Sequence, residues 1–140
     1  MTRTAQQTNA PRTADAGALD YQAAAARYFE AWNAVDPAAL TTAVAAAFTE
    51  DGSYTDPLAD VAGHEGLTAA IAGVHQQFPG FVFRQLGDVD GHHDIARFGW
   101  ELVSGADGSA PVAGFDVVRL AADGRIRSVL GFLDRVPSGA

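Results

Sequence analysis

The dipeptide Pro79-Gly80 separates two parts of the chain that have different hydrophobic periods. Before it, apolar residues recur at spacings of three and four, which is typical of amphipathic helices. After it, apolar segments separated by turn signals predict β-strands. We therefore expect an α+β fold, in which helices come first and pack against one sheet.

Three helices are predicted before this point, over about residues 20–35, 36–48 and 64–78. Asp20 and Asp36 are suitable N-caps, and Pro37 favours the first helical position. The first helix has an apolar stripe that includes Tyr28, so its hydroxyl should point towards the core. That stripe is formed by Tyr21, Ala25, Tyr28, Trp32 and Val35.

Four strands are predicted after Pro79-Gly80, over about residues 81–88, 94–104, 110–121 and 125–135. Their short connections predict an antiparallel meander. Asp116 interrupts an otherwise apolar face of the third of these strands. A carboxylate among apolar neighbours is costly to ionise, and Arg119 alternates to the opposite face, so a protonated Asp116 is expected.

A short strand around Tyr54 ends at Asp56-Pro57. Proline cannot donate to a ladder and favours an extended residue before it, so Asp56 should lie at the mouth of the strand. Residues 50–52 are expected to form a turn, and residues 58–63 a loop. A pocket between helices and sheet would then receive three polar side chains, those of Tyr28, Asp56 and Asp116.

The composition restricts the classes of function. A net charge of −8 argues against nucleic acid or an anionic membrane surface as the main partner. The chain has no cysteine and no lysine, which excludes thiol chemistry and a lysine Schiff base. Residues 1–18 have the composition of a disordered tail, and residues 19–136 are expected to form a single domain. With no apolar leader or membrane-spanning run, we expect a cytoplasmic protein.

Three segments resemble the opening of the NTF2-like superfamily, which includes SnoaL-like polyketide cyclases, limonene epoxide hydrolase and the ketosteroid isomerases. They are Arg27-Tyr28-Phe29-Glu30-Ala31-Trp32-Asn33-Ala34-Val35-Asp36, Phe48-Thr49-Glu50-Asp51-Gly52 and Tyr54-Thr55-Asp56-Pro57. The resemblance covers about residues 20–135. It implies a cone-shaped, cystatin-like fold of three N-terminal helices packed on a curved antiparallel sheet.

The pattern is most similar to that of the bacterial ketosteroid isomerases. The resemblance implies that Asp56 is the general base that removes a proton beside a ketone. It implies that Tyr28 and a neutral Asp116, within Phe115-Asp116-Val117-Val118-Arg119, donate hydrogen bonds to the enolate oxygen. It implies no metal or organic cofactor, and a small hydrophobic molecule as the partner.

Six further residues are expected to bind the substrate: Trp32, Tyr54, His64, His75, Trp100 and Phe132. The sequence also departs from the isomerases, because Ile71 stands where they carry another tyrosine and the loop after Asp56 is shorter. The limonene epoxide hydrolase pattern fits less well, since Gly131 stands where its last strand needs an acid.

Two alternatives remain open at the level of the sequence. The first is a SnoaL-like cyclase that uses an aspartate as acid and base on a polyketide. The second is a pocket that binds a small molecule without catalysis. In each case, strands that are apolar on both faces, with Phe115 and Val117 on the outer one, favour a homodimer.

Overall fold

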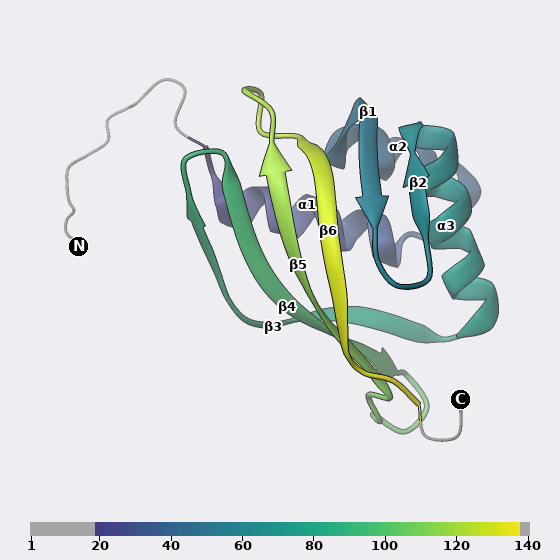
Figure 1. Cartoon of the computed structure of the whole chain (residues 1–140). Coiled ribbons are helices and arrows are strands. Elements are labelled where there is room, and N and C mark those ends of the chain that lie inside the picture. Colours follow the sequence, from purple (N-terminus) through teal and green to yellow (C-terminus); the bar gives the residue numbers. More distant parts are fainter. Residues whose placement is uncertain (1–18, 138–140) are drawn as a thin grey trace.

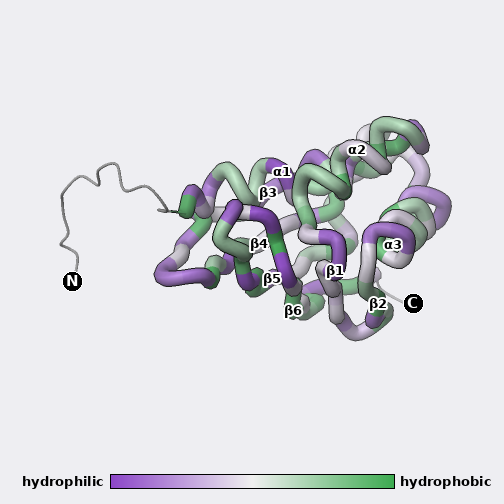
Figure 2. Tube along the Cα trace, turned by 90° about the horizontal axis from the view of Figure 1, so that it is seen from above, coloured by the Kyte–Doolittle hydropathy of each residue, from purple (hydrophilic) through white to green (hydrophobic). Residues whose placement is uncertain are grey.

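The computed structural model describes residues 19–137, so the proposed tail over residues 1–18 lies outside the described residues. Three helices cover one face of a curved six-stranded sheet, whose other face is open (Figure 1). Seen from above, the helices lie together on one side of the strands (Figure 2). The expected α+β, cone-shaped architecture is confirmed.

The helices begin where the capping residues predict. Helix α1 is Tyr21–Asn33, α2 is Pro37–Ala47 and α3 is Gly63–Gln77. The Asp20 carboxylate accepts a hydrogen bond from the backbone of Ala23, and Asp36 accepts one from Ala39. Helix α1 buries Tyr28 and Trp32, as predicted, but it ends before Val35, which is exposed. No helix in residues 19–137 is long and apolar enough to cross a membrane.

The strands follow the order β2-β1-β6-β5-β4-β3 across the sheet. Their bounds are β1 Phe48–Thr55, β2 Asp60–Ala62, β3 Phe81–His92, β4 Ile95–Ser104, β5 Val112–Leu120 and β6 Ile126–Arg135. Strands β3 to β6 form the predicted antiparallel meander, and β1 joins it by pairing in parallel with β6. This parallel pair brings the end of β1 beside the middle of β6.

Two predictions about the first hairpin were wrong. Residues 50–52 do not form a turn between elements but belong to β1, where the pairing with β6 jumps from Phe48 to Ser53. The turn-forming residues therefore make an irregular bulge within the strand. The predicted loop contains strand β2, which pairs antiparallel with the end of β1.

Strand β6 changes its inward face part of the way along. Its pairing with β5 passes from Ile126 to Ser128, so Arg127 is the extra residue of a bulge. One extra residue turns every later side chain to the other face of the sheet. Leu130 and Phe132 consequently lie on the outer face, 53% and 61% exposed, whereas an uninterrupted alternation would place them on the buried face with Ile126.

Candidate active site

A cavity of about 400 Å³ lies between the helices and the concave face of the sheet. Its walls are mostly aromatic and aliphatic, and polar side chains reach it chiefly near the end of β1. The lining residues from α1, β1 and the following turn are Tyr28, Trp32, Tyr54, Asp56 and Leu58. Those from α3 and the rest of the sheet are Val74, Gln77, Phe78, Phe83, Trp100, Leu102, Val112, Leu133, Val136 and Pro137.

Asp56 follows the last residue of β1 and is held by a local turn. Its Oδ1 accepts hydrogen bonds from the backbone N–H groups of Leu58 and Ala59, each at 2.8 Å. The Tyr54 hydroxyl donates to Oδ2 at 2.6 Å. Pro57 lies between these donors and ends the strand, as predicted. Three hydrogen-bond donors therefore orient the Asp56 carboxyl group and take the place of water around it at the edge of an apolar cavity.

Asp116 occupies a different setting, in the middle of β5. Its side chain is buried, and its Oδ2 accepts a hydrogen bond of 2.7 Å from the Tyr28 hydroxyl. Oδ1 has no hydrogen-bond partner among the described residues. Burial raises the pKa of Asp116 to about 6, while the Tyr28 hydroxyl and the nearby Trp100 indole oppose the rise, and the charge of Asp56 adds to it.

Gly131 is the residue that lets the two carboxyl groups approach each other. It pairs directly with Asp116 across β5 and β6. A Cβ at this position would lie 2.7 Å from Oδ1 of Asp116 and 3.4 Å from Cβ of Asp56. The absence of a side chain at Gly131 therefore leaves room for the Asp116 carboxyl group beside Asp56.

Both tyrosines are held in the protonated form. Burial raises the pKa of Tyr28 well above its ordinary value, and the negative charge of Asp116 raises it further. Burial also raises the pKa of Tyr54, followed by the effect of Asp116 and of its hydrogen bond to Asp56. Each hydroxyl is therefore a hydrogen-bond donor throughout the neutral range.

Aromatic rings form the wall above these groups. Phe83 lies between the two tryptophans, with ring centroids 5.2 Å from Trp32 and 5.3 Å from Trp100. Trp32 also packs on Tyr54 at 5.3 Å. Gly114 allows this arrangement, because a Cβ there would overlap the Trp100 ring. Trp32, Tyr54 and Trp100 thus lie where the sequence predicted, on the cavity.

Three other predicted binding residues lie outside the cavity lining. Phe132 is on the outer face because of the bulge at Arg127, so its prediction is corrected. Nε2 of His75 lies 2.6 Å from the carbonyl oxygen of Trp32 and ties α3 to α1. Nε2 of His64 lies 3.0 Å from the carbonyl oxygen of Phe48.

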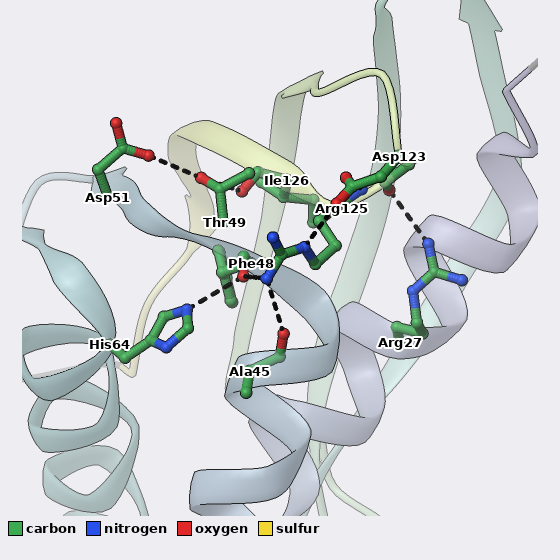
Figure 3. A network of polar contacts seen from close by, with 10 residues as sticks. Arg27, Ala45, Phe48, Thr49, Asp51, His64, Asp123, Arg125 and Ile126 are labelled. Carbon is green, nitrogen blue, oxygen red and sulfur yellow. Dashed lines mark hydrogen bonds and ion pairs between the residues drawn. The ribbon is translucent and has the colours of Figure 1, made fainter. Parts of the chain in front are cut away.

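His64 belongs to a separate polar network at the start of β1, the end remote from Asp56 (Figure 3). Arg125 donates to the carbonyls of Ala45 and Phe48 and pairs with Asp123. Arginine near the last carbonyls of α2 satisfies acceptors that a helix leaves unpaired. The network therefore joins helix, strand and the β5–β6 turn, and has no part in the cavity.

The adjacent histidines His92 and His93 lie exposed where β3 connects to β4. His92 ends β3, and His93 has a positive φ of 50° in the tight connection to β4. Within residues 19–137, no group of three or more His, Cys, Asp or Glu side chains is arranged to hold a metal ion.

The site thus contains two tyrosine–aspartate pairs beside one apolar cavity. Tyr28 and Asp116 form one pair, and Tyr54 and Asp56 form the other. Such a group can accept a proton on a carboxylate and supply phenolic hydrogen bonds to an oxygen that becomes negative. The pairing of Tyr54 with Asp56 was not predicted, although residues two apart on a strand share a face.

Comparisons with known proteins agree with this architecture. Residues 25–129 match the SnoaL-like domain family. A SnoaL-like protein from Agrobacterium tumefaciens str. C58, provisionally assigned as an isomerase, is 40% identical, with a TM-score of 0.77 over 81% of this chain and 97% of that one. No curated protein gives a significant match.

Two more distant structures share the fold. A SnoaL-like protein from Jannaschia sp. CCS1, provisionally assigned as a polyketide cyclase, is 21% identical, with a TM-score of 0.66 over 81% of this chain and 85% of that one. A protein with a cystatin-like fold from Nostoc punctiforme PCC 73102 is 18% identical, with a TM-score of 0.62 over 84% and 90%.

Proposed function

Because the chain belongs to the SnoaL-like family, we propose that it is a cofactor-independent enzyme that transfers a proton on a small hydrophobic carbonyl compound. The specific version is isomerisation of an enone of the ketosteroid type. One observation carries the proposal: the carboxylate of Asp56 borders an apolar cavity that Tyr28 also lines, with Asp116 bonded behind it.

In this reaction Asp56 takes a proton from the carbon next to the carbonyl. The C–H bond breaks, an O–H bond forms on the carboxylate, and the electron pair moves onto the carbonyl oxygen as a dienolate. Tyr28 donates a hydrogen bond to that oxygen. Asp56 then returns the proton to the carbon at the far end of the conjugated system, and the enzyme is restored.

We assign Asp116 a role behind Tyr28. Tyr28 lines the cavity, whereas Asp116 is not among its lining residues. A protonated Asp116 can donate to the phenolic oxygen of Tyr28, which leaves the phenolic hydrogen free for the substrate. Burial raises the pKa of Asp116 to about 6, so a minor share of the molecules holds this proton at neutral pH, and an apolar substrate that displaces water favours the neutral form further. The direct hydrogen bond to the enolate expected from the resemblance is replaced by this relay.

The walls favour an uncharged substrate. Within residues 19–137, none of the arginines lines the cavity, and lysine does not occur in the chain. An anionic group would therefore meet Asp56 without a cation to offset it. The rings of Trp32, Phe83 and Trp100, which pack edge to face, form an apolar wall that suits a hydrophobic skeleton with one carbonyl directed towards Tyr28.

The substitution Asp56→Asn tests the proposal on a model β,γ-unsaturated ketone. Loss of the base should lower kcat by roughly 10²–10⁴-fold, because asparagine cannot accept the proton. Asp60→Asn is the matched control, since Asp60 is exposed on the same hairpin and bonds only to Thr55 among the described residues. Full turnover by folded Asp56→Asn would remove Asp56 as the base.

Binding without catalysis is a second candidate, and a specific observation favours it. In the structure both tyrosine hydroxyls are already bonded to carboxylates. A purely structural pair of this kind could support a cavity for an apolar ligand. If the wild type binds the ketone saturably but does not turn it over, binding without catalysis replaces isomerisation as the proposed function. If the wild type cyclises a linear polyketide instead, cyclisation replaces it.

We also propose that the outer face of the sheet binds a second copy of the chain. Leu130 and Phe132 are exposed there, and Arg97 lies over the half-buried ring of Phe115 at 6.0 Å. Exposed apolar side chains of this kind on one face of a sheet favour a symmetric contact. Light scattering should give twice the mass of the chain, and a monomer at micromolar concentration would contradict this.

A further inference from the structure

The hydrogen bonds around Asp56 leave one of its two oxygens better placed to receive a proton. A carboxylate offers about four acceptor positions, two on each oxygen. Both positions on Oδ1 are occupied, because this atom accepts the backbone N–H groups of Leu58 and Ala59. Oδ2 accepts only the Tyr54 hydroxyl among the described residues. The position that remains open for a substrate proton is therefore on Oδ2.

We propose that Tyr54 is a positioning residue for the reaction: it orients the Asp56 carboxylate so that Oδ2 receives the proton, and it donates a hydrogen bond to that carboxylate at the edge of an apolar cavity. This inference rests on the proposed function of Asp56 as the base. It extends that function, because it assigns a role in the proton transfer to a residue expected only to contact the substrate.

Tyr54 is held rigidly enough to perform this task. It is 4% exposed and is paired in the sheet on both sides, with Val61 of β2 and Val129 of β6. Its ring also packs on Trp32. Neither the strand nor the ring can turn without breaking these contacts, so the hydroxyl has a fixed direction towards Asp56.

The surroundings explain why the carboxylate needs such a donor. Tyr28 from α1 is bonded to Asp116 of β5 instead of to Asp56, so it does not supply a donor to the proposed base. Strand β6 contributes Gly131, which carries no charge, and α3 contributes Gln77 to the cavity, while its His75 is bonded to a carbonyl of α1. Tyr54 is thus the side chain that offsets the loss of water around Oδ2.

Tyr54→Phe removes this donor and keeps the ring. A hydrogen bond to an ionised carboxylate stabilises the charged form, so its removal should move the acid limb of kcat/KM for the enone upward by about one pH unit. The rate on the plateau should also fall by roughly tenfold, because Asp56 loses its fixed orientation. Tyr21→Phe is the matched control, since the Tyr21 hydroxyl bonds to the carbonyl of His93, away from the cavity.

A second measurement separates this inference from the proposed function. If wild-type protein does not turn over the enone, the proposed function fails, but the carboxyl ¹³C resonance of Asp56 can still be titrated. A midpoint about one pH unit higher in Tyr54→Phe than in the wild type supports the positioning role. An equal midpoint in the two proteins overturns it.

A fluorinated residue covers the case in which Tyr54→Phe does not fold. Replacing Tyr54 by 3-fluorotyrosine keeps the shape and makes the hydroxyl a stronger donor. The acid limb, or the Asp56 titration midpoint, should then move to lower pH. A shift in the opposite direction, or none, contradicts the proposal.

Discussion

Asp56 and Asp116 are the same residue type on either side of Gly131, yet their surroundings differ sharply. Asp56 lies at a strand end, where the chain turns back and offers two backbone N–H groups in addition to Tyr54. Asp116 lies in the middle of a strand, where the backbone N–H groups pair with the neighbouring strands, and among the described residues it accepts a hydrogen bond from the Tyr28 hydroxyl, with the Trp100 indole nearby. The position of each acid in its strand therefore decides how well its charge is solvated.

The difference separates their chemistry. Three donors bind the carboxyl group of Asp56, whereas burial raises the pKa of Asp116 to about 6 and leaves one of its oxygens without a partner among the described residues. Two nearby acids in different surroundings are a common arrangement in acid–base catalysis. The comparison teaches that the proposed base and the proposed proton holder are distinguished by their burial and hydrogen bonds and not by residue type.

The largest expected effect is a decrease in the free energy of unfolding as the pH rises and the buried Asp116 ionises. The folded-state pKa of Asp116, about 6, is above its ordinary value of 3.8, so the folded protein binds more protons than the unfolded chain in this interval. The stabilisation is complete below about pH 4 and is lost as pH rises through about 6, by about 3 kcal/mol in total.

Asp116→Asn isolates this contribution, because asparagine is neutral at every pH and can still accept from Tyr28. Urea unfolding at pH 4.5 and pH 7.5 should show a steeper loss of the free energy of unfolding in the wild type than in the variant. Acids that pair with arginines, such as Asp94 and Glu101, titrate in both proteins and cancel in the comparison. If the free energy of unfolding had the same pH dependence in the wild type and the variant, ionisation of Asp116 would not destabilise the folded protein.

A smaller effect is expected from Gly131→Ala. The methyl group would lie 2.7 Å from Oδ1 of Asp116 and would push the two acids apart, at a cost of about 2 kcal/mol in the free energy of unfolding. Thermal unfolding compared with Gly73→Ala provides the control. Gly73 is exposed in α3 with no atom near its Cβ position, so alanine there should stabilise the helix slightly. Equal stability of the two variants would mean that the space at Gly131 is not needed.

Much of the fold could be predicted because local signals agree with it. Aspartate caps and Pro37 mark the helix starts, and turn residues separate the four strands of the meander. The bulge at Arg127 could not be predicted, because an extra residue in a strand can be recognised only from its pairing with the neighbouring strand. This single residue explains why Phe132 was placed on the wrong face.

The sequence could predict which residues belong to the candidate site better than it could predict which of them contact one another. Tyr28, Asp56 and Asp116 could be singled out because each is a polar group at a buried or strand-ending position. Asp56 comes near Asp116 because β1 pairs in parallel with β6. That contact joins segments about 75 residues apart and has no local signal in the sequence. The histidines were misplaced for the same reason, because each bonds to a distant carbonyl.

The most direct test of the contrast between the two acids is a ¹³C NMR titration of the Asp116 carboxyl group in the wild-type protein. The environment described above predicts a midpoint near pH 6, about two units above the ordinary value for aspartate. It also predicts that Tyr28→Phe moves this midpoint higher, because the remaining donor is lost. A midpoint near pH 4 in the folded protein would contradict the assignment of Asp116 as the proton holder behind Tyr28.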